Sequence, residues 1–73
     1  MNLYIQLSNV KDEINNLKYD LKFEIADYNY YKSETKWINN IMIKSNEHRL
    51  ELLKNTIEKI KYIKSQIKLL ESS

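Results

Sequence analysis

Residues 3–21 read LYIQLSNVKDEINNLKYDL, and the spacing of their apolar side chains decides the fold. Successive apolar residues alternate steps of four and three, the heptad pattern that places them on one stripe of an α-helix. This stripe consists of Leu3, Leu7, Val10, Ile14, Leu17 and Leu21. Ile25 and Tyr28 continue it. A seam of this kind predicts a helix that packs against another helix.

The C-terminal part of the chain carries a second seam of the same kind. It consists of Leu50, Leu53, Ile57, Ile60 and Ile67, broadened by Ile63 and Leu70. The chain contains no glycine and no proline, which sheets need for their many turns. The sequence therefore predicts an all-α fold, either a long helical hairpin or a bent long helix. We expect it to self-associate through its heptad seams, as a coiled coil or helical bundle.

The two seams differ in phase by one residue, which predicts a break between them. Counting sevens from Leu7 arrives at Arg49, whereas the later seam is set by Leu50. Ser45 or Asn46 can cap the N-terminus of a second helix. The preferred division of the single domain, residues 1–73, therefore has helix one over about 3–43, a turn at about 44–46 and helix two over about 47–71.

Two alternatives to this division stay open. The break can fall near Ser33, or the chain can form one uninterrupted helix. With the preferred break, helix one is about 60 Å long and helix two about 37 Å, at about 1.5 Å per residue. Helix two would then reach only to about residue 20 of helix one, leaving the seam from Leu3 to Leu17 uncovered. A second copy of the chain is the expected cover, because exposed apolar seams mark interaction surfaces.

Aromatic residues in the middle of the chain form another stripe. On a helix with about 100° per residue, they fall on the side nearly opposite the first seam. The residues of this stripe that we expect to bind a partner are Tyr19, Phe23, Tyr30, Trp37 and Ile41. Aromatic side chains are enriched in binding hot spots because they bury a large area. The alternative interpretation places both stripes in the core of a homodimeric bundle.

Basic residues are concentrated toward the C-terminus. Residues 1–43 carry five lysines and six acids, a net charge of −1, and residues 44–73 carry six lysines and one arginine against four acids, a net charge of +3. Four lysines are candidate contacts for nucleic-acid phosphates: Lys54, Lys61, Lys64 and Lys68. Lysine is also common on the flanks of coiled coils, so nucleic acid is the less favoured partner.

The sequence gives no support for catalysis or metal binding. It has no cysteine, one histidine (His48) and no glycine for a phosphate-binding loop, so we expect no enzyme activity, no metal and no cofactor. No apolar run is long enough for a signal peptide or a membrane span, which predicts a cytoplasmic protein without a membrane partner. The abundance of residues with AT-rich codons fits a low-GC bacterium or its phage.

The favoured hypothesis is a small helical protein-interaction module that acts stoichiometrically on another protein, as a regulator, an inhibitor or an assembly factor. Its expected partners are a second copy of itself, as a homodimer or a higher oligomer, and another protein. One alternative is a small dimeric nucleic-acid-binding protein that uses the basic C-terminal helix. A third hypothesis is a structural subunit of an assembly.

Overall fold

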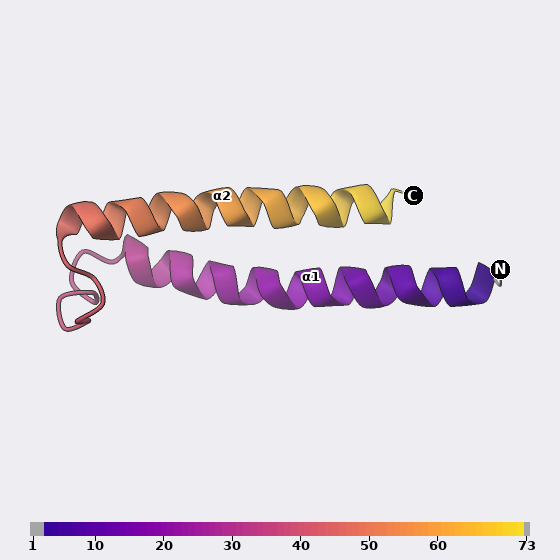
Figure 1. Cartoon of the computed structure of the whole chain (residues 1–73), viewed down its shortest axis with the longest axis horizontal. Helices are drawn as coiled ribbons and strands as arrows, with labels where there is room; N and C mark the ends of the chain where they lie inside the picture. The colour runs from indigo at the N-terminus through magenta and orange to yellow at the C-terminus, as the bar shows by residue number, and fades with distance from the viewer. Residues whose placement is uncertain (1–2, 73) are drawn as a thin grey trace.

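The protein is a hairpin of two long helices. The computed structural model describes the backbone of residues 3–72 and the side chains of residues 9–72. Helix α1 (Leu3–Lys32) and helix α2 (Asn46–Glu71) run side by side in opposite directions, joined at one end by a loop over residues 33–45 (Figure 1). The part of the chain that the structure describes contains no strand, which confirms the all-α hairpin.

Helix α1 is shorter than the sequence predicted. Its predicted end at residue 43 is wrong, because the helix stops at Lys32, next to the alternative break near Ser33. The Ser33 hydroxyl accepts hydrogen bonds from the backbone N–H groups of Thr35 (3.4 Å) and Lys36 (3.2 Å). A short polar side chain of this kind offers the backbone an alternative to helical hydrogen bonds. The helix therefore ends without glycine or proline.

Helix α2 begins where the capping pattern placed it. Ser45 has an extended backbone (φ −161°, ψ 168°), and its hydroxyl accepts a hydrogen bond from the backbone N–H of His48 at 3.0 Å. Glu47 lies in the first turn, where the helix dipole favours a negative charge. The predicted N-cap at Ser45 is confirmed. Helix α1 therefore ends next to one candidate break and helix α2 begins at the other, and the residues between them form the loop.

The two helices are close to equal in length, with 30 residues in α1 and 26 in α2. An ion pair between Lys18 Nζ and Glu71 Oε2 (3.8 Å) places the last turn of α2 beside Lys18. Ile14 and Leu17 are half-buried within one chain, so α2 covers them. Helix α2 thus ends close to the expected limit near residue 20, but Ile14 and Leu17, which the sequence predicted to be uncovered, are half-buried. Only the N-terminal end of α1 extends beyond α2 (Figure 1).

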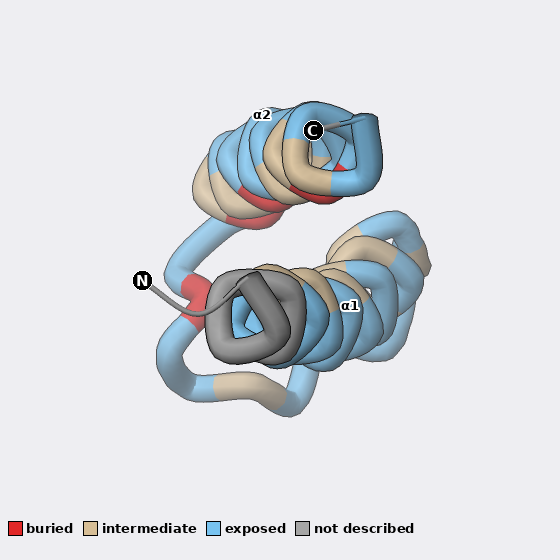
Figure 2. The backbone as a smooth tube through the Cα atoms, turned by 90° about the vertical axis from the view of Figure 1, so that its right-hand side faces the viewer, coloured by how far each residue is buried: buried red, intermediate tan, exposed pale blue. Residues whose placement is uncertain are grey.

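The core is a narrow strip between the helices (Figure 2). The buried residues among those described are Ile43, Arg49, Thr56 and Ile67, each with 5–8% of its surface exposed. Leu50, predicted to lie in the seam, is 47% exposed, and Lys64 is also exposed. The seam of α2 thus contains Arg49 and Thr56 in place of Leu50. Two helices bury only one stripe each, so most apolar residues stay partly accessible.

Candidate functional site

The loop carries the most exposed apolar side chains among the described residues. Ile41 is 93% exposed and Met42 is 75% exposed, and Ile38 beside them is also exposed. We call these three residues the loop tip. Ile43, the next residue along the chain, is buried and anchors the loop beneath them. Folding of one chain therefore leaves three large apolar groups in water at the closed end of the hairpin.

Hydrogen bonds hold the loop that presents the tip. The Tyr30 hydroxyl donates to the Lys36 carbonyl (3.3 Å) and accepts from Asn40 Nδ2 (3.1 Å). The Trp37 indole N–H donates to the Glu34 carbonyl at 2.9 Å. The Tyr30 contacts join the last turn of α1 to the middle of the loop, and the Trp37 contact lies within the loop. A loop held in this way loses less conformational entropy when it binds a partner.

The base of the loop is tied to both helices. Arg49 donates from Nη1 to the Tyr31 carbonyl (2.6 Å) and from Nε to Asn46 Oδ1 (3.0 Å). The Tyr31 carbonyl belongs to the last turn of α1, whose carbonyls have no partner within the helix. His48 Nδ1 accepts from the backbone N–H of Lys44 at 3.1 Å. Arg49 was not singled out from the sequence, because a charged residue beside an apolar seam is usually solvated.

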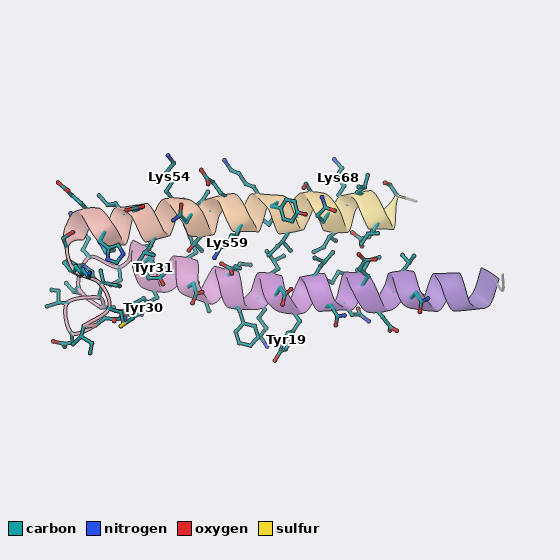
Figure 3. All side chains as sticks on the ribbon, in the orientation of Figure 1. Tyr19, Tyr30, Tyr31, Lys54, Lys59 and Lys68 are labelled. Carbon is teal, nitrogen blue, oxygen red and sulfur yellow. The ribbon has the colours of Figure 1, made fainter. Side chains whose placement is uncertain are left out.

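The predicted aromatic stripe is divided among three places. Tyr19 and Phe23 pack together on α1 with 62% and 55% of their surfaces exposed, and Figure 3 shows Tyr19 pointing away from α2. Tyr30 and Trp37 are half-buried and hold the loop. Ile41 lies in the loop tip. The prediction of one continuous helical stripe is wrong beyond residue 32, because the helix ends there.

The predicted oligomer seam faces α2 of the same chain. Ile14, Leu17 and Leu21 are half-buried along the interface between the helices, and Val10, nearer the N-terminus, is also half-buried. The side chains of Leu3 and Leu7 lie outside the described residues. Association of a second copy along this seam stays a prediction, and only the N-terminal end of α1 is left uncovered by α2 (Figure 1).

Two open grooves follow the two edges of the helix interface. One, about 450 Å³ in volume, is lined by polar and acidic residues, among them Glu24, Asp27, Tyr31 and Glu58. Burial, followed by the negative charge of Asp27, raises the pKa of Tyr31 above its ordinary value of 10.0. The phenol therefore stays neutral well into the alkaline range. This groove contains Lys59 as its one basic lining residue among those described.

The other groove is apolar and basic. It has a volume of about 430 Å³, and its lining includes Ile25, Tyr28, Ile57, Ile60, Lys61 and Lys64. We call it the lysine-rimmed groove. The Nζ of Lys32 lies 5.7 Å from the centre of the Tyr28 ring, which adds another cation to its edge. The opposite edges of one helix pair thus differ in charge.

The four lysines predicted as phosphate contacts are all exposed. Lys61 and Lys64 lie at the rim of the apolar groove, and Lys54 and Lys68 project from α2 away from α1 (Figure 3). On α1, Lys11, Lys18 and Lys22 fall on the same edge of the hairpin at about 100° per residue. The structure thus brings together lysines of both helices. The candidate phosphate contacts predicted from the sequence all lie on α2.

Comparison of the chain with protein-family models, with curated proteins and with solved structures found no match in any of the three. Over the described residues, neither α1 nor α2 has a stretch apolar enough and long enough to cross a membrane.

Proposed function

We propose that this hairpin is a protein-interaction module that binds another protein stoichiometrically through its loop tip. The observation that carries the proposal is the exposure of Ile38, Ile41 and Met42 on a loop held by side-chain hydrogen bonds. Exposed apolar groups are energetically favourable to bury, and clusters of them mark interaction sites. The partner would offer an apolar pocket to these side chains, and its own contacts at that pocket would be blocked. The module would thus act as a regulator, an inhibitor or an assembly factor.

Substitution of the loop tip tests this proposal. Ile41→Ser with Met42→Ser removes the two most exposed apolar groups and leaves every loop hydrogen bond of Tyr30 and Trp37 in place. Truncation of a hot-spot residue costs at least about 2 kcal/mol of binding, close to thirtyfold in affinity. We expect the variant to lose the protein that the unaltered chain captures from its source cells, with unchanged helix content and melting temperature.

Tyr62→Ser with Leu69→Ser is the matched control, because both residues are exposed and apolar but lie on α2. This control should capture the same partner as the unaltered chain. Equal capture by the loop-tip variant would remove the proposal. Tyr30→Ser with Trp37→Ser is a poorer test, because both side chains hold the loop and their loss would alter it.

Nucleic-acid binding is the second candidate function, and the lysines gathered on one edge of the hairpin favour it. They are Lys11, Lys18, Lys22, Lys32, Lys61 and Lys64, while Lys54 and Lys68 project from the outer side of α2. Binding of a duplex oligonucleotide, measured over a salt series, tests this candidate. Affinity should fall steeply with salt, with a slope of about −0.9 for each phosphate contacted. Absence of binding at low salt would exclude it.

A further inference from the structure

The lysine-rimmed groove has an unusual combination of surfaces. Its floor is formed by apolar groups of Ile25, Tyr28, Ile57 and Ile60, and Lys61 and Lys64 lie beside them. A phosphate backbone would satisfy the lysines and leave the apolar floor exposed to water. The chemistry that fits the whole groove is an apolar side chain with carboxylates beside it.

The outer face of α1 carries a surface of that chemistry. The rings of Tyr19 and Phe23 pack edge to face, with centroids 4.8 Å apart and an angle of 74° between their planes. Both are more than half exposed. Asp20 and Asp27 lie three and four residues from Phe23, so both carboxylates neighbour its ring on the helix surface. We call Tyr19 and Phe23 the aromatic pair.

We propose that the aromatic pair of one copy of this chain docks into the lysine-rimmed groove of a second copy. In this contact Asp20 and Asp27 of one copy lie against Lys61 and Lys64 of the other. Docking removes from water the 62% of the Tyr19 surface and the 55% of the Phe23 surface that one chain leaves exposed. The groove volume of about 430 Å³ lies within the range of about 300–1,000 Å³ that is usual for binding pockets.

The placement of the two surfaces determines the kind of assembly. The aromatic pair points away from α2, as Tyr19 shows in Figure 3, whereas the groove opens at the side, between the helices. One pair of copies therefore cannot satisfy both surfaces through a single two-fold contact. The contact is head to tail, and it builds a ring or an open row. This assembly uses neither the heptad seam nor the loop tip, so it goes beyond the function proposed above.

Complementary charge reversals test the contact. One variant is Asp20→Lys with Asp27→Lys, and the other is Lys61→Glu with Lys64→Glu. All four residues are exposed, so both variants should fold. Each variant alone places like charges against each other. Because like charges across an interface cost several kcal/mol, self-association should weaken at least about a hundredfold.

Mixing the two variants in equal amounts restores opposite charges at every contact. Sedimentation velocity over a protein concentration series should show monomer for each variant and assemblies larger than a dimer for the unaltered chain and the mixture. Tyr19→Ser with Phe23→Ser should also be monomeric. Lys36→Glu with Lys44→Glu, a reversal of two exposed loop lysines, should assemble like the unaltered chain.

A monomeric unaltered chain at submillimolar concentration, or a mixture that stays monomeric, would overturn the proposal. It would also be overturned if the Lys61 and Lys64 reversals abolished binding of a duplex oligonucleotide while the Asp20 and Asp27 reversals left assembly unchanged. In that case the groove lysines serve a nucleic acid. The loop-tip variant, Ile41→Ser with Met42→Ser, should assemble normally, so failure of this proposal is distinguishable from failure of the proposed partner binding.

Discussion

At the scale of single residues, the most informative side chain is Arg49. It is buried, although the apolar pattern assigned the neighbouring Leu50 to the seam. Its guanidinium donates hydrogen bonds to the Tyr31 carbonyl and to Asn46 Oδ1. These two hydrogen bonds replace bonds that an exposed guanidinium would make to water. Thr56 is buried on the same principle, because its hydroxyl donates to the Leu52 carbonyl at 2.9 Å. Polar groups with hydrogen-bond partners can lie in a helix seam where hydropathy predicts apolar residues.

Arg49→Ala should destabilise the hairpin by about 1–3 kcal/mol, because it leaves a carbonyl at the end of α1 without its partner. Lys54→Ala is the control: Lys54 is an exposed cation on the same helix, and its loss should change stability by less than about 0.5 kcal/mol. Urea unfolding monitored by circular dichroism measures both values. Equal stability of the two variants would show that the Arg49 hydrogen bonds contribute nothing.

At the scale of the elements, the loop over residues 33–45 leaves two helices of similar length, with 30 residues in α1 and 26 in α2. Helix α2 runs along α1 to Lys18, where Glu71 pairs with it, and Ile14 and Leu17 near this end are half-buried. The apolar seam of α1 is therefore largely covered by α2 of the same chain. The apolar surface that stays exposed lies elsewhere, in the loop tip, the aromatic pair and the lysine-rimmed groove.

Ile14→Glu should lower the stability of the fold by at least about 2 kcal/mol, because it places a charge against α2. Asn15→Glu is the control, since Asn15 is the exposed neighbour on the same turn. Thermal unfolding at two protein concentrations tenfold apart is the measurement. The loss should be the same at both, because α2 of the same chain covers Ile14. A loss seen only at the higher concentration would place Ile14 in a contact between copies.

At the scale of the whole molecule, the protein is a rod. Its principal extents are 52 × 17 × 15 Å, and the radius of gyration of its Cα atoms is 16.4 Å. A globular chain of this length would have a radius of gyration of about 11 Å. The elongated shape gives every residue a short path to the surface. It also provides long lateral edges, which suit side-by-side contacts better than enclosed sites.

Small-angle scattering should distinguish the hairpin from the uninterrupted helix that the sequence left open. The Tyr19→Ser, Phe23→Ser variant, at low concentration, should have a radius of gyration close to 16.4 Å. An uninterrupted helix of 73 residues would be about 110 Å long, with a radius of gyration near 30 Å. A value near the latter would show that the loop is helical in solution.

The features that the sequence determined by itself are local ones. The heptad spacing from Ile14 to Leu21 places one stripe against a neighbouring helix, and the structure has it there. The N-cap at Ser45 depends on a hydrogen bond that reaches three residues, to His48. The outward position of Tyr19 and Phe23 follows from helical periodicity alone. Each of these features requires only that the local backbone be helical or capped.

Only the tertiary structure decided where α1 ends, which residues complete the seam of α2, and which edges carry the grooves. Apolar spacing continues through residues 33–45, so periodicity alone cannot show that they form a loop. That loop is held by contacts that join residues far apart in the chain, such as Arg49 with the Tyr31 carbonyl and Asn40 with Tyr30. The lysine-rimmed groove likewise exists only because the antiparallel register brings Ile25 and Tyr28 beside Ile57 and Ile60. A spacing pattern describes each helix separately, and the site arises from their pairing.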